Sequence, residues 1–197
     1  MDRQETTRLL QQAKNGAAGA MDALYERVAG KLLALIRLRL GRSLRAQLES
    51  RDILQATFLK SFEHLWQFEQ GDGPSLMAWL ARIAENEIRD RVDYQNRQRR
   101  DVRLEVPLDT AHVGVVAAMR SALTQMLIDE RARRLEDALE SLEPHYREVI
   151  ILRCYEELSF PEIGARLGKS EDASRMLFAR AMAALTMRMA HAAGSGA

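Results

Sequence analysis

The side chains that most often perform catalysis or bind metals are few in this sequence and lie far apart. A zinc-protease frame such as H-E-x-x-H is absent, because the histidines are scattered along the chain as His64, His112, His145 and His191. Cys154 is the only cysteine, and its apolar surroundings predict a small core residue rather than a nucleophile. Gly71 and Gly73 follow a helical pattern, not a strand, so they do not form a phosphate-binding loop. We therefore expect no enzyme activity, no metal and no cofactor.

Arginine is the residue whose clustering does suggest a binding chemistry. The formal net charge is only +1, so composition alone does not indicate a nucleic-acid-binding protein. Two segments are nevertheless basic: residues 31–51, where Glu49 is the only acidic residue, and RQRRDVR at 97–103. Such clusters are either solvated helix faces or sites for phosphate groups, and the residues leave both possibilities open.

The segment LSFPEIGARLGKSEDASRMLFARAMAAL at 158–185 carries the signals of two helices joined by a tight turn. Ser159 can cap the first helix together with Glu162, and Pro161 lies in the first turn, where its missing N–H costs nothing. Gly168 can adopt the left-handed conformation that ends a helix, and Ser170 then begins the next one. The second helix of such a pair can enter the major groove of DNA, although any capped helical hairpin gives the same pattern.

Helical periodicity in most of the chain predicts an all-α protein with two small helical domains joined by a linker. Apolar stripes at 32–40, 53–65 and 76–88 predict a helical domain over residues 1–98, interrupted by a loop at 70–75. Residues 99–129 lack a sustained period and are interpreted as the linker. Breaks at Pro144, the Leu158-Ser159 step and Gly168 predict four helices over 130–190, followed by a flexible tail at 191–197.

A series of short motifs in a fixed order lies between Leu139 and Leu185. They are a leucine, a proline, REV, LR, LS-x-x-EI, LG and R-A, found here as Leu142, Pro144, Arg147, Glu148, Val149, Leu152, Arg153, Leu158, Ser159, Glu162, Ile163, Leu167, Gly168, Arg180 and Ala181. This series resembles region 4 of sigma-70-type RNA polymerase sigma factors of the extracytoplasmic-function (ECF) group. The resemblance implies that the last helix reads a minus-thirty-five promoter element, with Ser170, Glu171, Asp172, Ser174, Arg175 and Arg180 as the DNA-binding residues. Leu177 departs from the family pattern, which has an arginine there, so the bases read can differ from those of relatives.

A second series, DILQATF at 52–58 and LMAWLARIAEN at 76–86, resembles region 2 of the same family. That resemblance implies that one helix docks on the clamp of the largest polymerase subunit through Asp52, Gln55, Phe58 and Leu59. It also implies that melted DNA of the minus-ten element binds Gln70, Arg82, Asn86 and Arg89. The aromatic residues Trp66, Phe68 and Trp79 could stack on bases, but their place on apolar stripes favours the core.

The two resemblances cover about half of the chain and imply a transcription initiation factor whose partners are RNA polymerase core, promoter DNA and, where one exists, an anti-sigma factor. A cytoplasmic location is expected, because one cysteine allows no intrachain disulfide. No membrane association is expected, because no apolar run approaches the roughly 20 residues that span a bilayer. Two alternatives remain open. A helix-turn-helix regulator that works without polymerase predicts a stable dimer and palindromic operators, and a helical adaptor would leave both basic segments idle.

Overall fold

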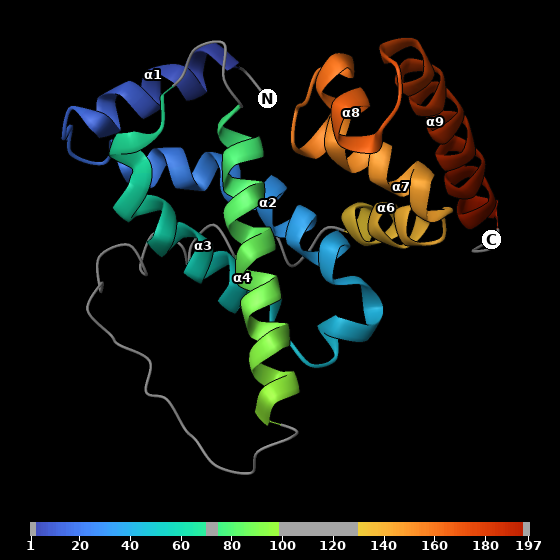
Figure 1. Cartoon of the computed structure of the whole chain (residues 1–197), viewed down its shortest axis with the longest axis horizontal. Helices are drawn as coiled ribbons and strands as arrows, with labels where there is room; N and C mark the ends of the chain where they lie inside the picture. Colours follow the sequence, from blue (N-terminus) through green and yellow to red (C-terminus); the bar gives the residue numbers. More distant parts are fainter. Residues whose placement is uncertain (1–2, 70–74, 99–129, 195–197) are drawn as a thin grey trace. The chain divides into compact units, whose positions relative to one another are not determined.

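A computed structural model of the chain describes residues 3–69, 75–98 and 130–194, and these residues are helical apart from short turns (Figure 1). They form two compact units: one comprises residues 3–69 and 80–98, and the other comprises residues 75–79 and 130–194. The predicted all-α fold is confirmed, since no strand occurs within these ranges. The linker predicted at 99–129 and residues 70–74 of the loop predicted at 70–75 lie outside the described residues.

The first unit consists of α1 (Arg3–Lys14), α2 (Ala20–Arg45), α3 (Ser50–His64), the 3-10 turn η1 (Leu65–Gln67) and most of α4 (Leu76–Gln98). Apolar positions three and four residues apart line one face of each helix, and these faces bury one another. Leu32 and Ile36 of α2, Ile53 and Leu54 of α3, and Leu80 of α4 are all essentially inaccessible to solvent. The core of the unit is therefore built from the apolar faces of α2, α3 and α4, and α2 is buried along most of its length.

The second unit contains α6 (Glu130–Glu140), α7 (Pro144–Ile150), the π-helical turn η3 (Ile151–Tyr155), α8 (Phe160–Leu167) and α9 (Glu171–Gly194). All three predicted breaks are confirmed, because α7 begins at Pro144, α8 begins directly after Ser159, and α8 ends at its cap residue Gly168. The core is made by apolar residues from every helix: Leu139, Val149, Leu152, Ile163, Ala181 and Leu185. Helix α9 continues to Gly194, so the first four residues of the predicted tail are helical.

Local interactions set the helix-turn-helix geometry at α8 and α9. Ser159 caps α8 as expected: its side chain accepts from the Glu162 N–H, and its own N–H donates to Glu162 Oε2 at 2.6 Å. Gly168 ends the helix in the left-handed conformation, with φ 65°. Gly164 allows the turn to close, because a Cβ there would lie 2.6 Å from the carbonyl oxygen of Lys169. The predicted helix-turn-helix is thus present at the expected residues.

The prediction for Cys154 is wrong, since this residue is exposed rather than part of the core. It lies in the π-helical turn η3, between the buried Leu152 and the half-buried Tyr155. A π turn holds more residues than an α turn and so shifts the faces that side chains occupy. Within the ranges that the structure describes, no helix is both long and apolar enough to cross a lipid bilayer.

Candidate functional sites

The outer face of α3 exposes the side chains expected to dock on a protein partner. Asp52 is exposed, and Gln55 and Leu59, at helical spacing from it, are partly exposed. Phe58 is a correction to the prediction, because it is 0% exposed and points into the core. Its ring stacks on that of Tyr25, with 4.4 Å between the centroids. Phe58 is therefore a core residue that packs α3 against α2.

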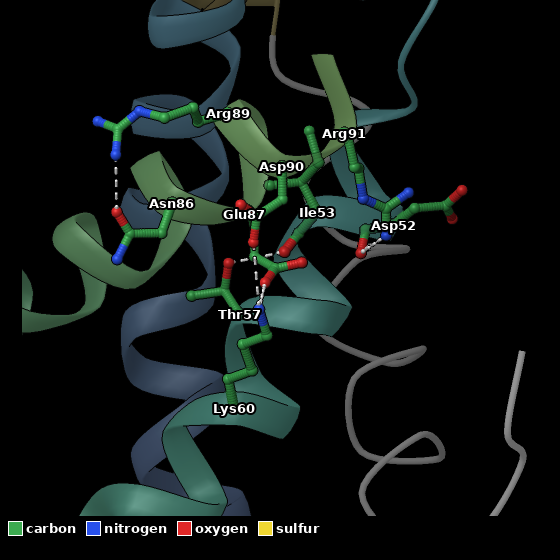
Figure 2. Close-up of polar contacts among 9 residues, drawn as sticks. All are labelled: Asp52, Ile53, Thr57, Lys60, Asn86, Glu87, Arg89, Asp90 and Arg91. Carbon is green, nitrogen blue, oxygen red and sulfur yellow. Dashed lines mark hydrogen bonds and ion pairs between the residues drawn. The ribbon is translucent and has the colours of Figure 1, made fainter. Parts of the chain in front are cut away.

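Polar contacts fix α3 against α4 beside this face (Figure 2). The Lys60 ammonium pairs with the Glu87 carboxylate and lies 3.7 Å from the Asp90 carboxylate. The Glu87 side chain is only 8% exposed, so the Lys60 charge beside it is what offsets the burial of its carboxylate. The pairing with Glu87 raises the pKa of Lys60 above its ordinary value. Arg91 of α4 forms a second contact between the helices by donating a hydrogen bond to the backbone oxygen of Asp52 in α3, at 3.3 Å.

The outer face of α4 carries a polar stripe formed by Arg82, Asn86 and Arg89, all three exposed. Their spacing of four and three residues puts them on one side of the helix. Arg89 donates to Asn86 Oδ1 at 3.4 Å, which orients the amide (Figure 2). Two cations and an amide on one helix face can hold a nucleic-acid strand by its phosphates and base edges. Gln70, expected beside them, lies outside the described residues.

The three aromatic residues considered for base stacking have different environments. Phe68 is buried and Trp79 is half-buried, as a core role predicts. Trp66 is the exception, because it is 56% exposed at the end of α3, in the turn η1. Trp66 is therefore the one of these three aromatic residues with a ring surface open to a partner.

The start of α9 brings together most of the residues expected to bind duplex DNA. Ser170 caps the helix by accepting from the Ala173 N–H at 3.2 Å, and Glu171 and Asp172 are exposed in the first turn. Carboxylates at this end stabilise the helix dipole. Ser174 is a correction, because it is 0% exposed and donates to the Ser170 carbonyl, so it cannot touch a base.

The cationic members of this set, Arg175 and Arg180, are exposed on α9. Arg175 forms an ion pair with Glu171 at 2.6 Å, and its guanidinium lies 4.7 Å from the centroid of the Phe160 ring. The sequence did not indicate Phe160 or Arg153 as neighbours of Arg175. The Arg153 guanidinium also lies over the Phe160 ring, 4.9 Å from its centroid. Nothing local in the sequence links 153, 160 and 175, so only the fold reveals this cluster.

Part of the basic segment 31–51 forms contacts within the first unit rather than facing solvent. Arg39 is mostly buried and pairs with Glu85 of α4 at 3.2 Å, which joins α2 to α4. Arg42 and Arg51 are exposed. Of the second segment, 97–103, only its first residues fall within the described part of the chain, and Arg97 is exposed there. Among the described residues no cluster of histidine, cysteine, aspartate and glutamate could hold a metal ion.

Comparison with known proteins gives matches in both units. The family described as Sigma-70 region 2 matches residues 24–98, and the family described as Sigma-70, region 4 matches residues 132–185. The chain is 33% identical to the RNA polymerase sigma factor CarQ of Myxococcus xanthus over 173 residues, which cover 85% of this chain and 87% of CarQ. It is 29% identical to the ECF RNA polymerase sigma factor BldN of Streptomyces coelicolor, over 90% of this chain and 63% of BldN.

Among solved structures, the chain is similar to the sigma factor RpoE in a co-crystal structure with the anti-sigma factor NepR from Bartonella quintana. The sequence identity is 22%, the TM-score is 0.48, and the likeness covers 84% of this chain and 92% of that chain.

Proposed function

The chain belongs to the ECF group of sigma-70 RNA polymerase sigma factors and is a transcription initiation factor, and from this membership we propose how its residues divide the work. Sigma factors bind RNA polymerase core and direct it to promoters. The observation that carries the proposal is that the region 2 match falls mainly on the first compact unit and the region 4 match on the second, and each unit has its own exposed polar face. We propose that the first unit binds core and the melted minus-ten element, and that the second binds the minus-thirty-five duplex.

Core binding is assigned to the outer face of α3. Asp52 provides a charge, Gln55 provides hydrogen-bond groups, and Leu59 provides a small apolar surface. A helix that exposes a few polar groups around an apolar contact suits a partner that must bind tightly and then be exchanged. The contacts of Lys60 with Glu87 and of Arg91 with Asp52 support this role, because they join α3 to α4 and keep the docking helix in one position.

The minus-ten strand is assigned to α4. Separating bases costs a few kcal/mol for each unstacked base, so the protein must supply compensating contacts. Arg82 and Arg89 can bind phosphates, and Asn86 can bind a base edge. Trp66 is exposed in the same unit and offers a ring on which a base can stack.

The minus-thirty-five duplex is assigned to the N-terminal half of α9. Arg175 and Arg180 are its cationic contacts, with Ser170 able to reach a phosphate. Glu171 and Asp172 are assigned a supporting role, since a carboxylate next to DNA is repelled by phosphates unless it accepts from a cytosine amino group. Glu171 already serves Arg175 as an ion-pair partner.

Other partners and roles follow from the same assignment. No catalytic residue is assigned, because a factor of this kind acts by binding and by stabilising open DNA. The site of action is the cytoplasm, where polymerase works. An anti-sigma factor is a further proposed partner, of the kind bound to RpoE in the Bartonella quintana structure, and it would silence the chain by covering α3 or α9.

The test of core docking is the double variant Asp52→Ala with Gln55→Ala. We expect its affinity for bacterial core polymerase to fall at least about tenfold, because hot-spot residues are each worth more than about 1 kcal/mol. Glu63→Ala is the matched control, since Glu63 is also an exposed residue of α3 but lies near its other end. Circular dichroism should report an unchanged fold. If the double variant bound core as tightly as the control, the assignment of α3 would be wrong.

The test of promoter reading is Arg175→Ala, with Arg188→Ala as the matched control on the same helix. Arg188 is also exposed but lies far from the start of α9. If Arg175 contacts a base edge, the variant should lose about 1 to 3 kcal/mol of binding to the preferred duplex and discriminate less at one position. If it contacts phosphate, the loss should be even across sequences and the salt slope should fall by about one. If Arg175→Ala bound every duplex as tightly as Arg188→Ala, both the base-reading role and the phosphate role of Arg175 would be refuted.

A further inference from the structure

Two arginine side chains from different elements converge on one aromatic ring in the second unit. Phe160 is the first residue of α8, Arg153 lies in the π-helical turn η3, and Arg175 lies in α9. The guanidinium carbon of Arg153 is 4.9 Å from the ring centroid, and that of Arg175 is 4.7 Å from it. Both distances are well within the range of a cation–π interaction. The ring therefore joins the helix that reads DNA to the segment before the helix-turn-helix.

The ring itself is held in place by the fold. Phe160 is half-buried and directly follows Ser159, the cap that forms the reciprocal box with Glu162. The edge of the Phe178 ring packs against it in a T-shaped contact, with centroids 5.9 Å apart. A guanidinium that stacks on this ring is consequently held at a defined place rather than free in solvent.

Both arginines are also oriented by a second contact. Arg153 donates to the carbonyl oxygen of Leu158 at 2.7 Å, and Arg175 pairs with Glu171 at 2.6 Å. Arg153 forms no ion pair within the described residues, so its charge remains uncompensated there. Two positive charges at one ring repel each other, and an anion that contacts both relieves that repulsion. The DNA backbone is the anion that the proposed function brings to this helix.

We propose that Phe160 is a positioning residue, whose ring holds Arg153 and Arg175 as a pre-oriented pair for the minus-thirty-five duplex. This inference rests on the proposed role of α9. Arginine loses considerable rotamer freedom when it binds, and a ring that has already restricted the side chain reduces that loss on binding. A stacked guanidinium also keeps its charge and most of its N–H donors, whereas an ion pair alone would compete with the phosphate.

The test measures closed-complex affinity of the holoenzyme, at a temperature low enough to keep the DNA duplex. The probe is a promoter fragment selected by the wild-type holoenzyme from a randomised library. Phe160→Leu removes the π face, and we expect affinity to fall about threefold to tenfold, the range for cation–π contacts at partly exposed sites. Phe160→Tyr keeps the π face and should bind within about twofold of wild type. Phe160→Met, an unbranched apolar replacement, repeats the test if the leucine variant folds poorly.

A double-mutant cycle separates positioning from a merely structural role. In a chain that carries Arg153→Ala and Arg175→Ala, the Phe160→Leu change should cost less than about twofold, because no guanidinium is left to position. Tyr146→Leu is the matched control, since Tyr146 is also a half-buried aromatic residue of the second unit but packs against His145 rather than against the Phe160 ring. That variant should retain wild-type affinity within about twofold.

The outcomes are distinct. The inference is overturned if Phe160→Leu binds DNA like wild type, or if it costs as much without the two arginines as with them. If the wild-type holoenzyme selects no promoter from the library, the proposed function itself fails. Selection of a promoter with no effect at Phe160 overturns the positioning role alone.

Discussion

Removing the ammonium of Lys60 should loosen α3 from α4, because this group forms the ion pair with Glu87 that joins the two helices. Lys60→Met keeps most of the aliphatic stem but leaves the Glu87 carboxylate, which is 8% exposed, without its cation. Stranding a fully buried charge costs about 3 to 5 kcal/mol. The Lys60 side chain is 49% exposed, however, so solvent already weakens the pair. We therefore expect a loss of about 1 to 2 kcal/mol in the first unit.

Amide hydrogen exchange is the suitable assay, because it reports each helix of a two-unit protein separately. The opening free energy of α3 and α4 should fall by about 1 to 2 kcal/mol, while α8 and α9 serve as an internal standard. The second substitution Glu87→Leu should restore much of the loss, since replacing both partners by apolar groups is often neutral. Lys169→Met, at an exposed position of the second unit, is the control. Unchanged protection of α3 and α4 in Lys60→Met would refute the reasoning.

Three other expectations concern the turn, the cap and a buried phenol. Gly164→Ala should destabilise the second unit by about 2 kcal/mol or more, because the new Cβ would lie 2.6 Å from the backbone oxygen of Lys169. Thermal unfolding should show this loss, and a promoter-binding assay should show weaker binding. Ser159→Ala should lower the free energy of unfolding by about 1 kcal/mol, measured with denaturant, because it removes the cap that Ser159 forms with Glu162. Ser159→Thr keeps a hydroxyl that can cap the helix, so it should lower that free energy less. Burial raises the pKa of Tyr25 from 10.0 to about 12, so its folded state holds the proton more tightly and stability should fall as pH rises from 10 towards 12. The loss of stability over this pH range should be smaller in Tyr25→Phe. An equal loss in the variant and the wild type would show that the Tyr25 phenol is not its source.

Features set by neighbouring residues could be predicted from the sequence. The cap at Ser159, the helix end at Gly168 and the break at Pro144 depend on contacts within a few residues, and all three lie where they were expected. The buried stripe of α9 likewise follows from spacing alone. Ser174 lies on that stripe, two helical turns before Ala181, so spacing predicts its burial although the family motif places it among the DNA-binding residues.

Features that depend on tertiary structure could not be predicted. Phe58 falls on the apolar stripe of α3, but the motif says only that an aromatic stands there and not that it stacks on Tyr25. The approach of Arg153 to Phe160 depends on the turn between η3 and α8, where Glu157 has the rare φ of 63°. Cys154 is exposed because a π turn changes the helical phase, and no periodicity of 3.6 residues anticipates that change.

The most direct measurement of the central claim is run-off transcription with purified chain and bacterial core polymerase on a library of promoters. Specific transcripts should appear, and they should disappear when the chain is left out. They should weaken for Asp52→Ala with Gln55→Ala through lost core binding and for Arg175→Ala through lost promoter binding. If the chain formed no stable complex with core and gave no specific transcript, it would not act as a sigma factor.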